Sequence, residues 1–530
     1  MQFSGRSILG FHDGQESGEV FHAISPSTGE PLPGEFTSAG PRDVDTAARL
    51  AAKAFATYSH VPAKIRAEFL RAVAGRIESI AETLIERAMQ ETALPRPRLQ
   101  GEVGRTCNQL RLFAQVIEEG SWVGARIDRA DPARQPAPKP DIRSMLHPIG
   151  PVVVFGASNF PLAFSVAGGD TASALAAGNP VIVKAHPAHP GTSALVGEAV
   201  REASRECHIP EGVFSLLFDK GIEVGTALVN HPLVKAVGFT GSRAAGQALM
   251  RACASRPEPI PFFGEMSSTN PVFVLPGAMR ERAEQIAAGL HGSFTLGAGQ
   301  FCTKPGIVLV PETPQTAAFV AKLSDLVRGS AAFTMLTPGI RKSYCSAVVE
   351  RKSVGTLRLL AEAQPSRDVP PLHALAALFE TDAQSFLHNP SLADEVFGPA
   401  TLLVRYSTRE QMMEIARNFE GHLTATLHAT DEDLRGAADL SSILVDKVGR
   451  LLLNGFPTGV EVCHAMVHGG PYPATSDGRS TSVGSQAIFR FARLVCYQGF
   501  PSEALPDELK DANPLGIWRM VDGNFTRDVI

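Results

Sequence analysis

One cysteine of this 530-residue chain stands in a segment unlike a hydrophobic core. Cys302 lies in the run FTLGAGQFCTKPG, between an expected helix and an expected strand. Glycine allows tight turns and a close approach of a substrate to the backbone. A free cysteine is most often a small buried core residue, but the Gly, Gln and Thr around Cys302 favour a nucleophile. Such a thiol needs a neighbouring group to ionise at neutral pH.

Two further polar residues could assist a nucleophile. Glu265 stands in PFFGEMSSTNPVFV, just before an expected strand. A carboxylate buried beside Phe262, Phe263 and Met266 would have a raised pKa, which suits a general base; a surface or helix-capping Glu is the ordinary alternative. Asn159 in FGASNFPLAF follows an expected strand. Its amide could donate to a developing oxyanion, and a turn residue is the alternative.

A third group of residues could hold an anionic ligand. Lys184 ends the expected strand in VIVKAHPAHPGT, and ligands of α/β sheets bind at the carboxyl ends of the strands. The run GFTGSRAAGQAL, which contains Gly241 and Ser242, follows another strand and opens a helix. It departs from GxGxxG and is a weak dinucleotide signature by itself. The histidines show no ligand spacing such as HExxH, so no metal is expected.

The elements that would position these residues show first helical and then strand periodicity. Apolar residues recur at i, i+3, i+4 and i+7 over 41–58, which predicts an amphipathic helix, and a second stripe covers 65–84. The Pro-rich run 130–142 predicts an extended connection. Short apolar strands then alternate with helices, which predicts a parallel sheet covered on both faces. The expected strands are 151–155, 181–184, 213–217 and 234–239, and the expected helices are 165–177, 191–204 and 223–230.

A second α/β unit is predicted after a boundary near residue 266. Its expected strands are 272–275, 307–310, 400–406 and 450–453, with a helix over 280–296 and a largely helical stretch over 314–365. The run 487–497 is apolar and strand-like, whereas the tail from residue 501 is polar and loop-like.

Composition disfavours several classes of protein. The 49 basic and 54 acidic side chains give a formal net charge of −5, which argues against nucleic acid as the main partner. No stretch of about 18 apolar residues predicts a membrane helix, and residues 1–12 lack the pattern of a secretory leader. The seven cysteines form no CxxC pairs. We therefore expect a reducing compartment and a cytoplasmic protein.

Taken together, these segments resemble the NAD(P)-dependent aldehyde dehydrogenases, in matching order from about residue 20 to about residue 500. GQFCT resembles the family's nucleophile segment, FFGEMSSTNPVFV its general-base segment and GASNFP its oxyanion segment. The resemblance implies that Cys302 attacks the aldehyde and gives a thiohemiacetal and then a thioester. Asn159 and the Cys302 backbone N–H would hold the oxyanion, and Glu265 would activate the water that releases the acid.

The same resemblance implies the cofactor contacts. VIVKAHP and GFTGS resemble cofactor segments, and EVFGPA resembles the segment whose Glu and Phe position the nicotinamide. The expected contacts are therefore Lys184, Gly241, Ser242, Glu395 and Phe397.

Two departures from the family pattern affect the cofactor and base segments. Ser267, Ser268 and Thr269 replace a common Gly-Gly-Lys, and Pro187 stands where many NAD-preferring members carry a Glu. Without that carboxylate a 2′-phosphate meets less repulsion, so NADP should be accepted as well as NAD. His186 and Lys220 are nearby candidates for a cation that would contact it.

The resemblance also implies an architecture. A Rossmann-like, doubly wound cofactor domain would span 1–127 and 150–265, and a second α/β domain with the nucleophile would span 266–469. A small bridging and oligomerisation sheet would comprise 128–149 and 470–500, followed by a tail over 501–530. A homodimer or homotetramer is expected.

One subgroup resembles the chain more closely. The segments FPTGVEVCHAMVHGGPYPATSDGRSTSVG and LKDANPLGIWRMVDG are similar to those of α-ketoglutaric semialdehyde (2,5-dioxovalerate) dehydrogenases. A substrate with a carboxylate needs a cation or hydroxyl cluster, for which Arg479, Ser480 and Thr481 are candidates, or else a polar loop. The alternatives are an NADP-linked dehydrogenase of fatty or other aliphatic aldehydes, a CoA-acylating dehydrogenase and a cofactor-independent thiol hydrolase. The lack of an evident His partner for Cys302 counts against the hydrolase.

Overall fold

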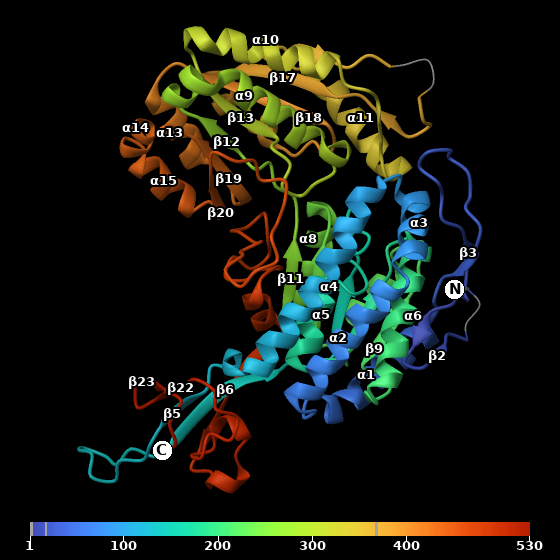
Figure 1. Cartoon of the computed structure of the whole chain (residues 1–530), viewed down its shortest axis with the longest axis vertical. Helices are drawn as coiled ribbons and strands as arrows, with labels where there is room; N and C mark the ends of the chain where they lie inside the picture. The colour runs from blue at the N-terminus through green and yellow to red at the C-terminus, as the bar shows by residue number, and fades with distance from the viewer. Residues whose placement is uncertain (1–3, 16–17, 366–368) are drawn as a thin grey trace.

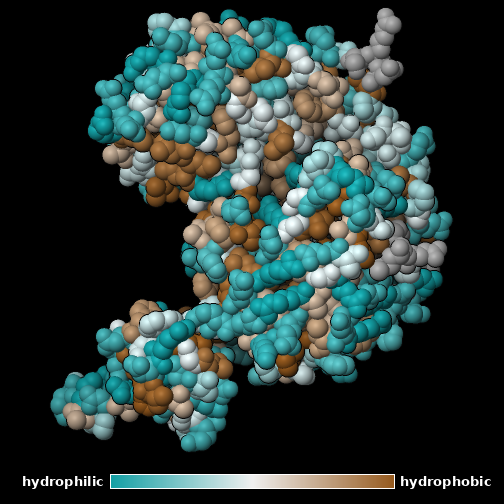
Figure 2. Space-filling view, viewed as in Figure 1, coloured by the Kyte–Doolittle hydropathy of each residue, from teal (hydrophilic) through white to brown (hydrophobic). Residues whose placement is uncertain are grey.

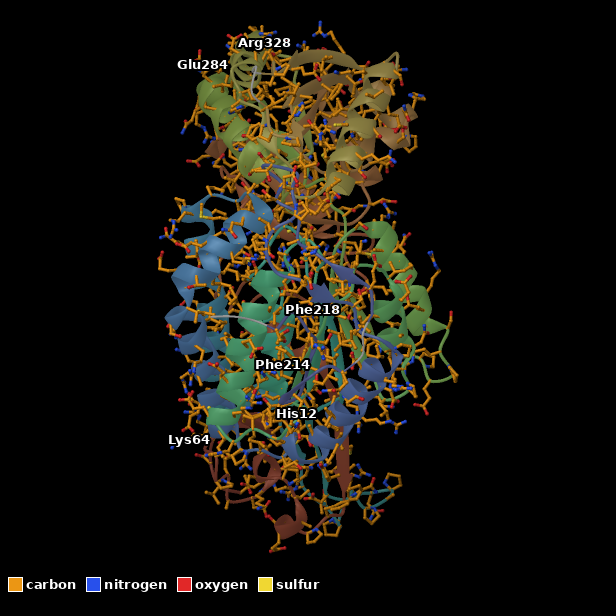
Figure 3. All side chains as sticks on the ribbon, turned by 90° about the vertical axis from the view of Figure 1, so that its right-hand side faces the viewer. His12, Lys64, Phe214, Phe218, Glu284 and Arg328 are labelled. Carbon is orange, nitrogen blue, oxygen red and sulfur yellow. The ribbon has the colours of Figure 1, made fainter. Side chains whose placement is uncertain are left out.

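The computed structural model describes residues 4–15, 18–365 and 369–530. Two seven-stranded sheets, each with helices on both faces, lie at the centre and at the top of Figure 1, and a five-stranded sheet projects from them at the bottom. Figure 3, turned by 90°, shows Phe214 and Phe218 inside the central unit, and Glu284 and Arg328 at the far end of the upper unit. In the part of the chain described, no helix is long and apolar enough to cross a membrane.

Four helices in the N-terminal part of the chain cover the central sheet. The expected helix over 41–58 is present, but the stripe over 65–84 is divided at Ile80, whose backbone (φ −107°, ψ 10°) leaves the helical region. Two small strands precede them and pair with each other, β3 (Val20–Phe21) and β4 (Phe36–Thr37). The helices are α1 (Pro41–Tyr58), α2 (Ala63–Ser79), α3 (Ala81–Thr92) and α4 (Arg96–Glu119), followed by the 3-10 turn η1 (Ser121–Val123).

The central sheet has the order β11-β10-β7-β8-β9-β1-β2. Its parallel strands are β7 (Val152–Phe155), β8 (Val181–Lys184), β9 (Phe214–Leu217), β10 (Ala236–Thr240) and β11 (Phe262–Glu265), with β1 (Ile8–Leu9) and β2 (His12–Asp13) antiparallel at one edge. The connecting helices are α5 (Gly169–Ala177), α6 (Pro190–Glu206), α7 (Glu223–Asn230) and α8 (Arg243–Ala254). The strand order reverses beside β7, and such a switch point leaves a crevice at the carboxyl ends of the strands.

The upper sheet has the order β15-β17-β18-β13-β12-β19-β20. Its strands are β12 (Val272–Val274), β13 (Ile307–Pro311), β15 (Arg358–Glu362), β17 (Ala377–Asp382), β18 (Ala400–Tyr406), β19 (His422–His428) and β20 (Val448–Leu453), with β14 (Phe333–Thr334) and β16 (His373–Ala374) paired separately. Its helices are α9 (Pro276–Thr295), α10 (Pro314–Arg328), α11 (Pro338–Ser353), α12 (Ala383–His388), α13 (Arg409–Asn418), α14 (Asp431–Arg435) and α15 (Ala438–Val445), with 3-10 turns η2 (Leu296–Gly299) and η3 (Pro390–Ala393). The first unit ends its strands at Glu265, and the second begins them at Val272.

The projecting sheet contains more of the C-terminal segment than the sequence predicts. Its order is β21-β6-β5-β22-β23, with β5 (Arg126–Asp128), β6 (Ile142–Pro148), β21 (Ala492–Gln498), β22 (Arg519–Val521) and β23 (Asn524–Thr526). The tail from residue 501 is therefore not simply a loop. It includes the 3-10 turns η5 (Ser502–Ala504) and η6 (Asp507–Leu509), and its apolar residues pack beneath the sheet in a core of their own. The expected strand over 487–497 begins only at Ala492, because Ser485–Phe491 forms a partly buried 3-10 turn (η4).

Candidate active site

A pocket of about 610 Å³ opens at the switch point of the central sheet, between the central and upper units. The carboxyl ends of β7, β8, β10 and β11 form one wall, and loops of the upper unit form the other. Its size falls within the range of small-molecule and cofactor sites. Nine of the residues singled out above line it: Asn159, Lys184, His186, Gly241, Ser242, Glu265, Cys302, Glu395 and Phe397.

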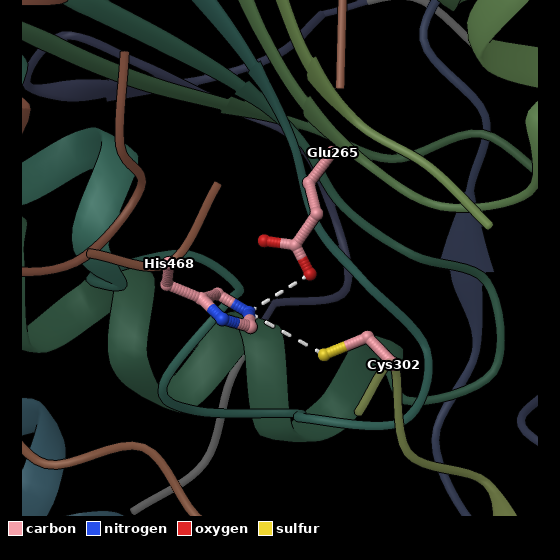
Figure 4. A group of neighbouring side chains, drawn as sticks. All are labelled: Glu265, Cys302 and His468. Atoms are coloured by element: carbon pink, nitrogen blue, oxygen red, sulfur yellow. Dashed lines mark hydrogen bonds and ion pairs between the residues drawn. The ribbon is translucent and has the colours of Figure 1, made fainter. Parts of the chain in front are cut away.

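Three side chains from distant segments meet at this pocket (Figure 4). The Sγ of Cys302 lies 3.4 Å from Nε2 of His468, and the same nitrogen lies 3.0 Å from Oε1 of Glu265. Ser482 donates its hydroxyl to the other carboxylate oxygen at 3.0 Å. Because Nε2 faces a carboxylate oxygen, it carries the proton and donates to Glu265. Glu265 precedes β12, as the sequence predicts, and is also the last residue of β11, a strand that the sequence does not predict.

The electrostatics of this triad keep Cys302 protonated. Burial raises the pKa of the Cys302 thiol well above its usual value, and the adjacent Glu265 carboxylate raises that pKa further. Burial alone would raise the pKa of Glu265, but the charge and hydrogen bond of His468, with bonds from Cys302 and Ser482, outweigh it. The pKa of Glu265 is therefore lowered, and the sequence-based expectation of a raised pKa is wrong, because His468 was not foreseen.

The loop that carries Cys302 is held by its backbone. Gly299 has a φ of +65°, and a Cβ there would lie 2.2 Å from the carbonyl oxygen of Gly398, so only glycine fits this close approach. Asn270 donates its amide to the carbonyl of Cys302 at 2.8 Å and to that of Lys304 at 3.0 Å. Lys304 in turn donates to the carbonyl of Val396, in the loop that carries Glu395 and Phe397, and to that of Ala400, where β18 begins. The nucleophile and the two nicotinamide residues expected by resemblance are thus fixed relative to one another.

Asn159 is held against the same loop. Its Nδ2 donates to the carbonyl of Gln300 at 3.0 Å, which leaves the second amide hydrogen for another acceptor. The loop after Asn159 is fixed by Glu102, whose Oε1 accepts the backbone N–H groups of Leu162 and Ala163.

Two of the expected cofactor residues differ from the prediction. His186 lines the pocket, but burial, with His189 and Lys184 nearby, lowers its pKa well below the usual value, so it is neutral at pH 7. Lys220 pairs with Glu19 at 2.7 Å on the surface and is not among the lining residues. Neither therefore supplies a free cation, because proximity in sequence to a strand end does not fix the direction or solvation of a side chain.

The residues expected from the resemblance at the cofactor end are otherwise in place. Lys184 is buried, with its ammonium donating to the carbonyl of Asp219 at 3.1 Å, and burial lowers its pKa. Burial raises the pKa of Glu395 to about 7, against the opposing effects of Lys304 and a hydrogen bond from Ser267. Ser267 thus contacts the expected nicotinamide Glu from the segment that departs from the family pattern.

The predicted substrate cluster is not brought to Cys302 as a unit. The Arg479 side chain is 92% exposed and pairs with Asp477. With Ser480, it lines a separate groove near the projecting sheet. Thr481 is buried, but its hydroxyl accepts the backbone N–H of His468 at 2.8 Å and donates to the Val483 carbonyl. Thr481 therefore supports the His468 segment, and a polar loop is the better description of Arg479.

His468 is the residue that sequence reasoning missed. The apparent lack of a His partner for Cys302 counted against a thiol hydrolase, and that argument is wrong. The signal was present in the run MVHGG, but it lies 166 residues from Cys302 and no local pattern links the two. The donor atoms of Glu265, Cys302 and His468 also lie within 4.8 Å of one another. They could hold a thiophilic cation, so the absence of a metal stays a prediction.

The comparisons with known proteins identify the class first. Residues 11–472 match the aldehyde dehydrogenase family, and the chain belongs to that family, whose members oxidise aldehydes to carboxylic acids. Among solved structures, an aldehyde dehydrogenase from Bacillus cereus covers 93% of this chain and is itself covered over 96%, with a TM-score of 0.79 and 19% identity. An NADP-dependent glyceraldehyde-3-phosphate dehydrogenase from Bacillus halodurans, complexed with NADP, gives a TM-score of 0.79, 20% identity and coverages of 94% and 100%. The predicted fold and enzyme class are confirmed.

Two relatives are similar over nearly the whole length. Alpha-ketoglutaric semialdehyde dehydrogenase 2 of Azospirillum brasilense is 49% identical over 99% of both chains. Alpha-ketoglutaric semialdehyde dehydrogenase of Acinetobacter baylyi is 46% identical over 96% of both chains. The resemblance to this subgroup is thereby confirmed.

Proposed function

We propose that this protein oxidises α-ketoglutaric semialdehyde to 2-oxoglutarate, with NADP or NAD as hydride acceptor. The observation that carries the proposal is the Cys302–His468–Glu265 triad at a pocket of cofactor size. The names of these two alpha-ketoglutaric semialdehyde dehydrogenases support the choice of aldehyde. Oxidation of a fatty or other aliphatic aldehyde is the alternative.

The residues of the pocket fit a dinucleotide. Lys184 is a buried ammonium whose hydrogen-bond acceptor is a main-chain carbonyl, so it can also bind ribose hydroxyls or phosphate. The first turn of α8, with Gly241 and Ser242 before it, opens toward the pocket, and a helix N-terminus favours a pyrophosphate. Glu395 and Phe397 would hold the nicotinamide end. The bound cofactor supplies the hydride acceptor.

The chain's own residues perform the steps on carbon and sulfur. As Sγ of Cys302 attacks the aldehyde carbon, Glu265 takes the thiol proton, and Asn159 with the Cys302 backbone N–H stabilises the oxyanion. Loss of hydride from the same carbon leaves a thioester on Cys302. Glu265, after releasing its proton, then deprotonates a water, which attacks the thioester and frees the acid and the thiol. One aldehyde, one oxidised cofactor and one water give the carboxylate, the reduced cofactor and two protons.

His468 acts on this sequence by positioning Glu265 beside Cys302. We expect His468→Leu to lower kcat by roughly 10- to 100-fold, because a hydrogen bond to a charged group is worth about 1.5–3 kcal/mol. His468 lowers the pKa of Glu265, so its loss raises that pKa and moves the acidic limb of the kcat–pH profile to higher pH. His468→Gln, which keeps an N–H donor, should recover part of both effects. An unchanged pH profile in His468→Leu would contradict the positioning role.

The cofactor preference is predicted to depend on the position after His186. Pro187 leaves that position without a carboxylate, and the neutral His186 beside it gives little preference of its own. Pro187→Glu should raise the KM for NADP by about 10-fold or more through repulsion of the 2′-phosphate, with the KM for NAD changed less than threefold. Steady-state KM values for both cofactors check this, and an equal change in both would contradict it.

Assembly into a homodimer or homotetramer is proposed from the open sheet edges. β21 ends the projecting sheet and β20 ends the upper sheet, and unpaired edges readily add a strand from another chain. Leu494 on β21 and Leu453 on β20 are exposed. Figure 2 shows hydrophobic side chains gathered over α15 and β20, beside the hollow that separates the upper unit from the projecting sheet. Sedimentation at several protein concentrations tests the assembly.

The predicted cytoplasmic location is kept as a proposal, supported by seven free cysteines.

The test of the proposed function is the absorbance of reduced nicotinamide with an aldehyde panel. The panel contains α-ketoglutaric semialdehyde, succinic semialdehyde, and short and long aliphatic aldehydes, each with NADP and with NAD. We expect the highest kcat/KM with α-ketoglutaric semialdehyde. A preference for long aliphatic aldehydes would favour the alternative, and a requirement for CoA would indicate an acylating enzyme.

A further inference from the structure

A cation that forms no ion pair with any described residue lies on the inner face of α4. Arg98, Glu102 and Arg105 stand at positions i, i+4 and i+7 of this helix and so share a face. Glu102 is fully engaged, because one carboxylate oxygen accepts two backbone N–H groups and the other pairs with Arg98 at 3.3 Å. In the described ranges, Arg105 has neither an ion pair nor a hydrogen bond. The guanidinium of Arg105 is thus available to a ligand.

Arg105 is nevertheless removed from water to a large extent. Its side chain is half-buried, and its guanidinium carbon lies 4.9 Å from the ring centre of Phe164 and 5.8 Å from that of Phe160. Burial lowers its pKa, but a guanidinium remains charged in proteins. Ring faces compensate a desolvated cation only partly. An unpaired charge in such a place is costly, which is the arrangement expected of a site that receives an anion.

The same aromatic rings connect Arg105 to the nucleophile. The ring of Phe164 is 5.8 Å from that of His468, whose Nε2 contacts Sγ of Cys302. Phe160 packs at 5.2 Å on Phe301, the residue before Cys302. Against burial, which lowers the pKa of Arg105, the carboxylates of Glu102 and Glu265 and the thiolate form of Cys302 raise that pKa. Arg105 and Cys302 therefore border one apolar cluster, whose buried members are Ala157, Phe160, Ala163, Phe164, Phe301 and Val483.

Two neighbouring arginines show why Arg105 differs. Arg98 lies over Phe160 and Phe301 in a similar way, but Glu102 neutralises it. Arg450 also adds positive charge near Cys302. However, its two terminal nitrogens already donate to the carbonyls of Gly459 and Pro457 at 2.9 and 2.7 Å. Arg105 alone of the three keeps its donor fork free for a planar acceptor, and carboxylates match that fork.

We propose that Arg105 binds the carboxylate of an aldehyde acid whose aldehyde carbon is at Cys302, with Phe160, Phe164 and Phe301 lining the carbon chain between them. The inference rests on the proposed oxidation of an aldehyde at Cys302 and deepens it by assigning the group that selects acidic aldehydes. Arg105 takes the carboxylate-binding role that the sequence suggested for Arg479, whose side chain is exposed and pairs with Asp477.

The test compares aldehydes of equal length with and without a carboxylate. Arg105→Met should lower kcat/KM about 100-fold or more for α-ketoglutaric and succinic semialdehydes, because a buried charge partner is lost. The kcat/KM for pentanal and butanal should change less than threefold, which also shows that the variant folds. Arg105→Lys should recover part of the acidic substrates' rate. Arg479→Met is the matched control and should leave all four rates unchanged.

A binding measurement separates this inference from the proposed function. Calorimetric titration of 2-oxoglutarate into the Cys302→Ala variant should show binding that Arg105→Met weakens about 100-fold or more. Equal losses for acidic and neutral aldehydes, or unaltered acid selectivity and 2-oxoglutarate affinity, would overturn the role of Arg105. If the unsubstituted protein reduces neither nucleotide with any aldehyde, the proposed function fails, while the titration still decides whether Arg105 binds a carboxylate.

Discussion

We expect Cys302→Ala to abolish aldehyde oxidation, with a loss of kcat on the order of 10⁵-fold, because the covalent route has no other nucleophile. The substitution removes one sulfur from a loop held by the backbone contacts of Asn270 and Gly299, so the fold and the cofactor pocket should persist. Steady-state reduction of NADP measures the first effect. Quenching of protein fluorescence by NADPH measures the second, with a Kd changed less than threefold.

Cys207→Ala provides the matched control for this experiment. Cys207 is half-buried at the end of α6 and is not among the lining residues of the pocket, so its replacement should leave kcat unchanged. Oxidation by Cys302→Ala at more than a few per cent of the normal rate would remove Cys302 from the role of nucleophile.

Glu265→Gln should lower steady-state kcat by about 10²- to 10³-fold, the usual contribution of a general base. Loss of the Glu265 carboxylate lowers the pKa of Cys302, so the thiol can attack as a thiolate without Glu265 as its proton acceptor. The hydride step precedes the need for an activated water, so a burst of reduced cofactor equal to one equivalent per active site should precede the slow rate. Rapid-mixing absorbance at the reduced-nicotinamide band measures both phases. A normal steady-state rate without a burst would exclude Glu265 as the base for hydrolysis.

The same variant should alter the reactivity of the resting thiol in the opposite direction. Burial and then the Glu265 carboxylate raise the pKa of Cys302, so removing that charge lowers the pKa and increases the thiolate fraction at pH 7. The curve of Cys302 alkylation rate against pH should therefore move to lower pH in Glu265→Gln. A shift to higher pH would mean that Glu265 stabilises the thiolate in the resting protein.

The parts of the fold predicted from sequence are those with a local signal. The strands β7, β8 and β13 are short apolar runs bounded by turns, and α1 has a clear helical stripe. The strand β19 (HLTATLH) was missed because its buried face includes Thr and His, which resemble an exposed segment. The strand β15 lies in a stretch that the sequence predicts to be largely helical, and the two-residue strands have no sequence pattern.

The site residues follow the same rule, because only those in a distinctive local segment could be predicted from the sequence. Cys302, Glu265 and Asn159 stand in distinctive segments, and the structure gathers them at one pocket. His468 and Arg105 lack such segments, because their proximity to Cys302 depends on how β11, α4 and the loop after β20 pack together. The sequence favours Arg479 only through its residue type and its place in the chain. Its solvation, which only the fold determines, excludes it from the cluster around Cys302.

A thiol hydrolase needs a histidine beside its nucleophile, and His468 does contact Cys302. Nε2 of His468, however, donates to Glu265 and so is not free to accept the proton of the Cys302 thiol. The adjacent pocket also contains Lys184, Glu395 and Phe397, which a hydrolase has no use for. A hydrolase would cleave an activated ester fully without nucleotide and produce no absorbance change with aldehydes.

We expect aldehyde oxidation to pass through a thioester on Cys302, which is hydrolysed by a water that Glu265 activates. Intact mass spectrometry of Glu265→Gln, mixed with α-ketoglutaric semialdehyde and NADP, tests it most directly. We predict an added mass equal to the aldehyde less two hydrogens, located on the peptide that contains Cys302 and absent when the nucleotide is omitted. An unmodified Cys302 while reduced cofactor accumulates, or an adduct on another residue, would contradict the account.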